Sequence, residues 1–355
     1  MKILLVTTVL HHGVIGPAKF ARYLYERQDI DVDVLVENEE PADNVVSFPV
    51  RLGWFSRKLS VYNRIKRYQK QLLPICHQYD VVLFSSGILA YGLPPIPAIP
   101  MVMINDDNYL TAGLSLTKKG LIDRFYRHIE RKLVKNSNYL IVNSLYLKQK
   151  VVAEYGCAAD NIHVLYKAAS LPQSTRTSIS WTAKTTPIRI FFVKNDYVRG
   201  GLLDLVEALA ILSDVTFHLT VVGCQPTLPM VANVSYHIRG GLPNEEVLEL
   251  MQTQHIYCVP SRREALGVAN MEAMASGIPV VTTDAGGIPE VITEREGWIA
   301  KPADSRSLAA VLRRCILEPD LRAQKVVLAR EKVKMFSADR MITRLKEIIE
   351  EVLAN

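Results

Sequence analysis

The stretch SRREALGVANMEAMASGIPVVTTDAGGIPE (261–290) combines a loop, a helical pattern and a strand-like run. It follows the apolar run IYCVP, and Gly267 separates the loop from NMEAMAS, a helical segment that Gly277 ends. The next run, IPVVTT, has the composition of a buried strand. Two glutamates, Glu264 and Glu272, flank the uncharged segment ALGVANM. Because a carboxylate in an apolar segment is costly unless it is paired or hydrogen-bonded, both need a partner.

The start of this predicted helix is a candidate anion site. A helix start has free backbone N–H groups and the positive end of the helix dipole, which favour phosphate. Glu272 lies about one turn into the helix, where it can accept hydrogen bonds from a ribose diol. Glu264 precedes the helix and can reach sugar hydroxyls. The alternative interpretation is a surface glutamate followed by a glutamate that the helix dipole stabilises.

Strand-like runs alternate with helical segments along most of the chain. The first half contains ILLVTT, VDVLVE, VVLFSS, PMVMIN, YLIVNS and IHVLY, and the second contains IRIFFV, FHLTVVG, SYHIRG, HIYCVPS and PVVTT. This alternation predicts the α/β class, with parallel sheets and crossover helices. Ligands of such sheets bind beyond the carboxyl ends of the strands, so the functional residues are expected in loops that follow strands.

A chain of 355 residues favours two domains. The segment LPQSTRTSISWTAKTTP (171–187) is rich in Ser, Thr and Pro and has no periodicity, which is typical of a linker. We therefore predict a first domain over 1–167, completed by a returning helix at 338–355. A linker over 168–187 leads to a second domain over 188–337.

Positive charge is concentrated in the first half of the chain. Residues 1–180 contain 22 Lys and Arg against 15 Asp and Glu, whereas residues 181–355 contain 20 against 21. Basic segments at 51–71 and 118–135 predict a peripheral contact with an anionic membrane. A solvated helix face that packs through its apolar stripe is the alternative. Nucleic-acid binding is disfavoured because no recognition module accompanies the charge.

The cellular compartment is predicted from the length of the apolar segments and from the pattern of cysteines. The initial run MKILLVTT is too short for a signal peptide and is predicted as a first strand. Four prolines interrupt the uncharged stretch 81–104, which argues against a transmembrane helix. Five scattered cysteines without a C-x-x-C pair argue against a disulfide framework and a zinc site. We predict a cytoplasmic protein, peripheral at the inner face of the cell membrane.

The run VPSRREALGVANMEAMASGIPVVTTDAGGIPEVI resembles the donor-site region of the family 4 glycosyltransferases. Glu264 and Glu272 match their E-x7-E motif, and the similarity is close over 188–312. It continues more loosely through NSLYLKQKVVAEYG (143–156) and GVIGPAKFARYL. The resemblance implies a GT-B fold, in which two Rossmann-like domains face a deep cleft.

The resemblance also implies an activity. Members of this family transfer a sugar, with retention, from a UDP- or GDP-linked donor to an acceptor hydroxyl. The implied acceptor belongs to cell-envelope polysaccharide or glycolipid synthesis. No metal and no cofactor is expected, and the sequence has no D-x-D triplet. The implied partners are therefore a nucleotide sugar and a sugar, glycolipid or other small acceptor.

The family pattern assigns roles around the two glutamates. By resemblance, Glu272 binds the ribose and Glu264 contacts the transferred sugar. The backbone of three residues between them is expected to line the sugar-phosphate: Leu266, Gly267 and Val268.

Cations for the diphosphate are expected in FFVKNDYVRGG. The family usually has a Gly-Arg pair and a lysine before glycine. Here Arg199 stands in the place of that lysine, and Lys194 lies near the usual Gly-Arg pair. A guanidinium binds phosphate at two points, so Arg199 is the predicted main clamp and Lys194 a weaker one. The alternative is two solvated loop cations.

The N-terminal half supplies further candidates by resemblance. Gly13 and Gly16 follow the first strand, where the family has a glycine-rich loop facing the donor phosphates. The spacing is not G-x-G-x-x-G, which disfavours a dinucleotide cofactor. Asp106 is the predicted contact with donor sugar or acceptor, although Asn105 stands where relatives often have histidine. A turn-forming Asn-Asp-Asp is the alternative.

Such departures favour a second hypothesis, a nucleotide-sugar-binding protein with weakened turnover. They include Ala168, which replaces the glycine of the family's Pro-Asn-Gly. The intact pair of glutamates favours catalysis. An epimerase or phosphorylase is disfavoured because no candidate lysine motif for pyridoxal phosphate is present.

Overall fold

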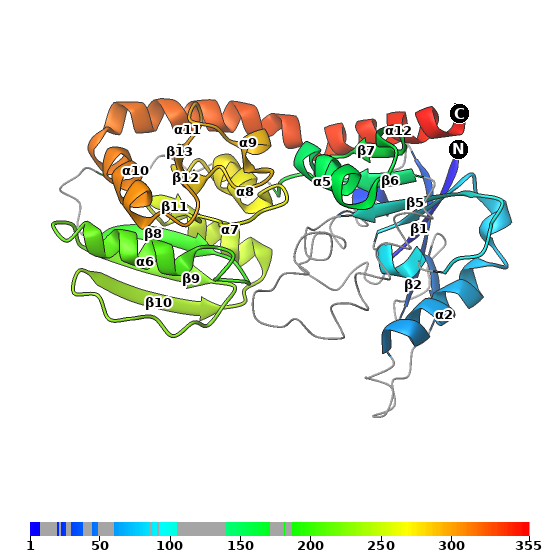
Figure 1. Ribbon diagram of the computed structural model, residues 1–355, viewed down its shortest axis with the longest axis horizontal. Coiled ribbons are helices and arrows are strands. Elements are labelled where there is room, and N and C mark those ends of the chain that lie inside the picture. Colours follow the sequence, from blue (N-terminus) through cyan, green and yellow to red (C-terminus); the bar gives the residue numbers. More distant parts are fainter. Residues whose placement is uncertain are drawn as a thin grey trace. The chain divides into compact units, whose positions relative to one another are not determined.

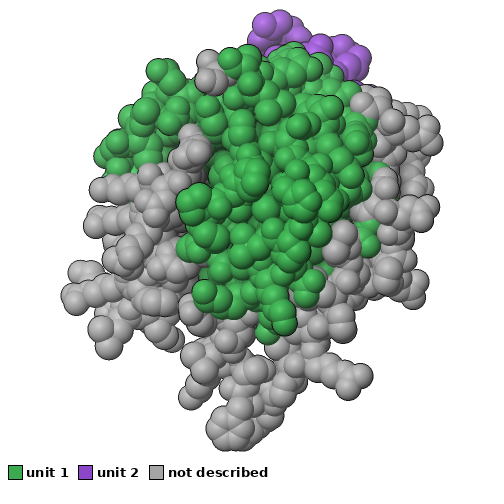
Figure 2. All heavy atoms as spheres, turned by 90° about the vertical axis from the view of Figure 1, so that its right-hand side faces the viewer, with its two compact units in different colours: residues 1–166, 341–355 green, residues 167–340 purple. Residues whose placement is uncertain are grey.

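The computed structural model describes about three quarters of the chain, as two compact units. The described residues are 1–7, 20, 23–25, 30–37, 45–48, 60–85, 87–90, 92–104, 139–170, 181 and 187–354. The first unit combines Met1–Tyr166 with Met341–Asn355, and the second is Lys167–Arg340 (Figure 2). Each unit is built around its own parallel sheet (Figure 1).

The sheet of the first unit has the strand order β3-β2-β1-β4-β5-β6-β7, and all its pairings are parallel. Its strands are β1 (Lys2–Val6), β2 (Asp31–Glu37), β3 (Val45–Phe48), β4 (Val81–Phe84), β5 (Ile99–Ile104), β6 (Tyr139–Val142) and β7 (Ile162–Val164). The central strands β1 and β4 are almost wholly buried, as expected for a parallel sheet covered on both faces.

The described helices of this unit bury one face each. They are α2 (Ser60–Leu72), α5 (Leu145–Tyr155) and most of α12 (Ala338–Ala354). Helix α2 directs Ile65, Tyr68 and Leu72 into the core, and the Tyr68 hydroxyl donates to the Thr7 carbonyl at 2.7 Å. The Ser144 side chain caps α5 by accepting from the Leu147 N–H at 3.1 Å.

The sheet of the second unit has the order β10-β9-β8-β11-β12-β13, again with every pairing parallel. Its strands are β8 (Ile188–Val193), β9 (Phe217–Val222), β10 (Val234–Gly240), β11 (Ile256–Cys258), β12 (Val280–Thr283) and β13 (Trp298–Ala300). In chain order this is the 3-2-1-4-5-6 arrangement of Rossmann-like folds. The predicted α/β class with two parallel-sheet, Rossmann-like domains is confirmed.

Six α-helices lie wholly within this unit among the described residues, and a 3-10 helix, η5 (Lys334–Phe336), follows the last of them. The six α-helices are α6 (Leu202–Ile211), α7 (Asn244–Gln252), α8 (Val268–Ser276), α9 (Ile288–Val291), α10 (Ser305–Leu317) and α11 (Pro319–Val333). Helix α11 has no counterpart among the predicted elements. Its buried face contains Arg322 and Lys325 beside Ala329 and Val333, so charged residues interrupt the apolar pattern of this helix. Strands β3 and β13 also have no counterpart among the predicted strand-like runs.

The segment predicted as a linker contains one side chain that is fixed within the second unit. Trp181 is buried, and its ring stacks on His255 with centroids 5.3 Å apart. The Arg322 guanidinium lies 3.6 Å from the centroid of the same ring and donates to the Trp181 carbonyl at 2.9 Å. Trp181 is therefore an anchoring point inside a segment that has no sequence periodicity.

Candidate active site

The strand order of the second unit brings two loops together. Strands β8 and β11 are neighbours, although β9 and β10 intervene in the sequence, and the order reverses between them. Lys194 follows β8 directly, and Glu264 lies in the loop after β11. Their side chains form an ion pair in which each is about one-fifth exposed. The reversal point is where ligands bind in such sheets, so this pair occupies the expected position.

The loop that contains Glu264 is held against the segment AGGIPE. The Glu264 carbonyl accepts from the Gly287 N–H at 3.0 Å, and its Oε1 accepts from the Ala265 N–H at 3.2 Å. A Cβ on Gly287 would lie 2.1 Å from the Ala265 carbonyl oxygen. Position 287 therefore requires glycine because the two backbones approach too closely for any side chain.

The turn that contains Arg199 is built by a side-chain cap and by a glycine with positive φ. The Asp196 Oδ1 accepts from the N–H groups of Val198 and Arg199, at 3.1 and 3.0 Å. Gly201 has φ of 71°, and a Cβ there would lie 2.1 Å from the Pro260 carbonyl oxygen. The turn after β8 and the loop after β11 are thus in backbone contact, and Arg199 is brought beside the loop of Glu264.

A further ion pair joins these two loops, and it was not predicted from the sequence. The Arg262 N–H donates to the Arg199 carbonyl at 2.8 Å. The Arg262 guanidinium donates to both carboxylate oxygens of Asp204, at 2.7 and 2.6 Å. Asp204 is buried in the first turn of α6, and its hydrogen bonds raise the pKa of Arg262. Arg262 and Asp204 are 58 positions apart, so no local sequence motif could indicate that they pair.

Helix α8 begins directly after Gly267, which has φ of 95°. Leu266 is buried beneath this start, and Val268 is the first helical residue. Glu272 is only 7% exposed, and its Oε1 accepts from the Asn244 amide at 3.3 Å. Asn244 is the first residue of α7 and was not predicted as part of the site. The structure therefore gives the helix start and the buried carboxylate that the sequence pattern predicted.

Tyr257 on β11 links the two glutamates electrostatically. Its ring is completely buried, and burial raises the pKa of its hydroxyl well above the usual value. The negative charges of Glu264 and Glu272 raise this pKa further. Both carboxylates thus act on the same phenol, which stays protonated throughout the physiological range.

Several predicted positions lie outside the described residues. These are Gly13, Gly16, Asp106 and the basic segment 118–135. Of the segment 51–71, helix α2 is described from Ser60 onward; its apolar stripe packs inward, and Lys66 and Lys70 are exposed. The membrane contact and the roles of these residues stay predictions. The deep cleft between the domains also stays a prediction.

The described residues contain neither a metal-binding cluster nor a helix that could span a membrane. No group of three or more His, Cys, Asp or Glu side chains in these ranges is arranged to hold a metal ion. No helix in the same ranges combines the length and apolar composition needed to cross a bilayer.

Family models match both parts of the chain. The model of the glycosyl transferases group 1 matches residues 174–332, and that of glycosyltransferase family 4 matches residues 18–171. The amylovoran biosynthesis glycosyltransferase AmsK of Erwinia amylovora is 28% identical over 259 residues. This alignment covers 68% of the present chain and 62% of AmsK. The second unit, which contains the paired loops, falls almost entirely within the first of these models.

Solved structures with similar folds cover the whole chain. A sucrose-phosphate synthase from Thermosynechococcus elongatus has a TM-score of 0.77 and 17% identity, with 99% of each chain covered. HepE of Anabaena, in complex with UDP-glucose, has a TM-score of 0.68 and 18% identity, covering 100% of this chain and 99% of its own. At these identities the likeness shows the fold, which is the GT-B fold of glycosyltransferases.

Proposed function

Because this chain belongs to the family 4 glycosyltransferases of GT-B fold, we propose that it transfers a sugar from a nucleotide diphosphate donor to an acceptor hydroxyl. The donor is UDP- or GDP-linked, the anomeric configuration is retained, and no metal is required. The acceptor belongs to cell-envelope polysaccharide or glycolipid synthesis. The observation that carries this proposal is the Lys194–Glu264 ion pair at the reversal point between β8 and β11.

The donor is proposed to bind across the paired loops. Glu272, buried beside Asn244, accepts hydrogen bonds from the ribose diol. The backbone N–H groups at the start of α8 bind the phosphates, and the positive end of the helix dipole favours them. Glu264 is partly exposed and accepts hydrogen bonds from hydroxyls of the transferred sugar.

The cations are proposed to stabilise the leaving group. As the bond to the sugar breaks, negative charge accumulates on the nucleotide diphosphate, and fixed positive groups lower this barrier. Arg199 is the main clamp. Lys194 exchanges its contact with Glu264 for a phosphate oxygen when the donor binds, which frees Glu264 for the sugar.

Retention is proposed to occur without a protein nucleophile. The acceptor oxygen attacks the anomeric carbon on the face from which the diphosphate leaves, and the acceptor proton passes to the departing diphosphate. Glu264 and Glu272 therefore hold the donor and do not act as the acid–nucleophile pair of a glycosidase.

The test is turnover of the purified full chain with UDP-glucose and with GDP-mannose, in the absence of an added acceptor. Water then acts as acceptor, and proton NMR records the first anomer released. We expect slow release of nucleotide diphosphate with the α-anomer appearing first. Glu264→Gln should reduce the rate by roughly a hundredfold, as expected when one group that acts on the transition state is removed. Glu249→Gln, an exposed position on α7, is the matched control.

Three outcomes separate the hypotheses. First appearance of the β-anomer would contradict retention. A donor that binds without any turnover would favour the nucleotide-sugar-binding protein. Equal rates for Glu264→Gln and Glu249→Gln would remove Glu264 from the site.

A further inference from the structure

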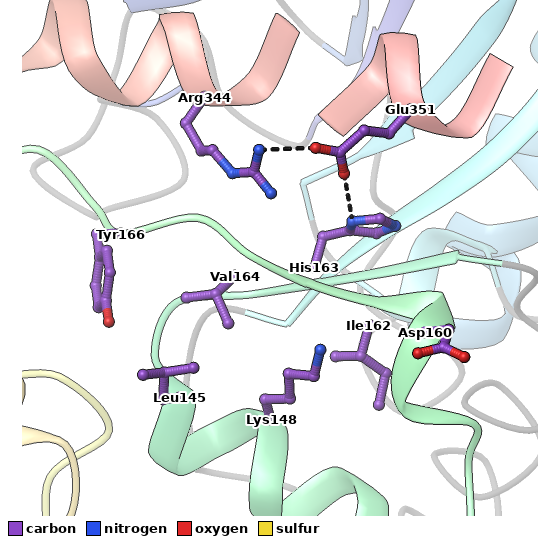
Figure 3. Close-up of a pocket in the computed structure, with 9 residues that line it drawn as sticks. All are labelled: Leu145, Lys148, Asp160, Ile162, His163, Val164, Tyr166, Arg344 and Glu351. Carbon is purple, nitrogen blue, oxygen red and sulfur yellow. Dashed lines mark hydrogen bonds and ion pairs between the residues drawn. The ribbon is translucent and has the colours of Figure 1, made fainter. Parts of the chain in front are cut away.

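A second candidate site is built entirely from residues of the first unit. It is a cavity of about 600 Å³, within the range of about 300–1,000 Å³ that is usual for small-molecule sites. Helix α5, strand β7 and helix α12 form its walls (Figure 3). Its polar lining residues are Lys148, Asp160, His163, Tyr166, Arg344 and Glu351.

The position of the cavity follows from the sheet topology. Strand β7 is the last strand in the order of the first sheet, and among the described strands it pairs with β6 alone. Leu145 begins α5 just after β6, and Tyr166 lies just after β7. Both residues line the cavity and lie past the carboxyl ends of their strands. One end of the groove therefore opens at the edge of the sheet where ligands of parallel α/β folds bind.

Helices α5 and α12 each place one basic side chain in the lining of the groove. Figure 3 shows Lys148 on α5 and Arg344 on α12, with the β7 segment between them. Arg344 is held by Glu351, whose Oε1 accepts at 2.9 Å, and by Glu347. Within the part of the chain that the structure describes, no carboxylate forms an ion pair with Lys148. Its ammonium group is thus available to a ligand in the groove.

His163 is neutral between these charges. Its Nδ1 faces the Glu351 Oε2 at 3.5 Å. Burial lowers the pKa of the ring, and this outweighs the opposing effect of Glu351. Arg344 and Lys148 lower it as well. Near neutral pH the ring therefore adds no charge to the groove.

The lining is polar but has no net charge. The positive charges of Lys148 and Arg344 are matched by the negative charges of Asp160 and Glu351. An anion would meet two carboxylates, and a cation would meet two basic groups. A neutral ligand with many hydroxyls can donate to the carboxylates and accept from the basic groups at the same time.

The groove also has apolar side chains in its lining. Leu145, Ile162, Val164 and the ring of Tyr166 line the same groove. The C–H faces of a sugar ring are apolar and its edges carry hydroxyls, so a saccharide needs both kinds of contact. A groove lined by both polar and apolar side chains does not suit a purely ionic ligand.

We propose that this groove is a second carbohydrate site, which binds an uncharged saccharide segment of the acceptor. The inference rests on the proposed transfer to a saccharide acceptor and deepens it. The segment held here consists of sugar units other than the one that receives the new bond, so the preferred substrate contains several sugar units. Lys148 and Tyr166 are the residues that bind this segment.

The test is binding of neutral and charged trisaccharides to the full chain, measured by saturation-transfer difference NMR. The probes are maltotriose and cellotriose, with trigalacturonate as the charged comparison. We expect a neutral trisaccharide to bind, and Lys148→Ala and Tyr166→Ala each to weaken it by roughly tenfold, about 1.4 kcal/mol. Lys150→Ala is the matched control, because Lys150 lies on the same helix, outside the groove, and pairs with Glu154 at 3.7 Å.

A parallel thermal-shift measurement with UDP-glucose keeps the two proposals distinguishable. Lys148→Ala should leave the UDP-glucose response unchanged. Equal saccharide binding by Lys148→Ala and Lys150→Ala would overturn the inference. So would binding of trigalacturonate alone, or no saccharide binding by a chain that responds to UDP-glucose. Saccharide binding without any response to nucleotide sugars would support the groove and contradict the proposed donor.

Discussion

Glu264 and Glu272 belong to one sequence motif but have different surroundings. Glu264 lies in a loop, is partly exposed and pairs with Lys194. Glu272 lies inside α8, is buried and accepts from the Asn244 amide. The Glu272 carboxylate is thus enclosed and bonded to an amide, whereas the Glu264 carboxylate is partly exposed and paired with a cation. The two therefore suit different parts of one donor molecule.

This difference predicts separable effects on binding. Glu272→Ala should weaken UDP and UDP-glucose equally, by about 10- to 100-fold, because the ribose is common to both. Glu264→Gln should weaken UDP-glucose more than UDP. Isothermal titration calorimetry with both ligands measures the four affinities, with Glu249→Ala as the exposed control. Equal losses for both ligands in Glu264→Gln would contradict a contact with the transferred sugar.

At the scale of elements, the site depends on how the turn after β8 is attached to the loop after β11. The attachment consists of the Arg262 N–H bond to the Arg199 carbonyl and the bidentate pair of Arg262 with Asp204. The Asp204 side chain is 9% exposed, so the carboxylate of this ion pair is shielded from water. The pair thereby joins the first turn of α6 to the loop after β11.

Arg262→Leu should destabilise the second unit and loosen the site. It leaves the buried carboxylate of Asp204 without its charged donor, which costs about 1.5–3 kcal/mol. The midpoint of urea unfolding should fall and the Kd for UDP-glucose should rise.

Arg313 provides a matched control in the same unit. It forms an equally short bidentate pair with Asp214, at 2.8 and 2.6 Å, but both partners are largely exposed. Because exposed ion pairs contribute little, Arg313→Leu should change neither quantity measurably. If Arg262→Leu behaved like Arg313→Leu, the pair would have no positioning role.

At the scale of the whole molecule, each unit contains a histidine that burial makes harder to protonate. Burial is the main cause of the lowered pKa of His163 in the first unit and of His218 in the second. A histidine with a lowered folded pKa binds its proton more readily in the unfolded chain. Stability is therefore complete above the unfolded pKa of about 6.5 and declines as the pH falls below it.

The free energy of unfolding should consequently decrease between pH 7.5 and pH 5.5, before most carboxylates titrate. Calorimetric melting of wild type across this range measures the slope. His163→Gln should make the slope shallower, whereas the exposed His77→Gln should leave it unchanged. An identical pH dependence in wild type and His163→Gln would contradict a contribution from this histidine.

The sequence by itself determined the alternation of strands and helices, and hence two parallel sheets. It also determined the pair of glutamates and Gly267, which precedes the helix that contains Glu272. These features are local, because strand composition, helix stops and motif spacing are properties of neighbouring residues. Helix α11 was not predicted from the sequence, because it buries Arg322 and Lys325 although charged residues are usually exposed.

Only the tertiary structure decided which groups meet. Lys194 is 70 positions from Glu264, Asn244 is 28 from Glu272 and Asp204 is 58 from Arg262. Such contacts depend on the order of strands across the sheet, which hydrophobic periodicity does not encode. The groove beside β7 is of the same kind, because α5 and α12 are far apart in the chain. Periodicity specifies the elements, and packing of the sheet and helices specifies the site.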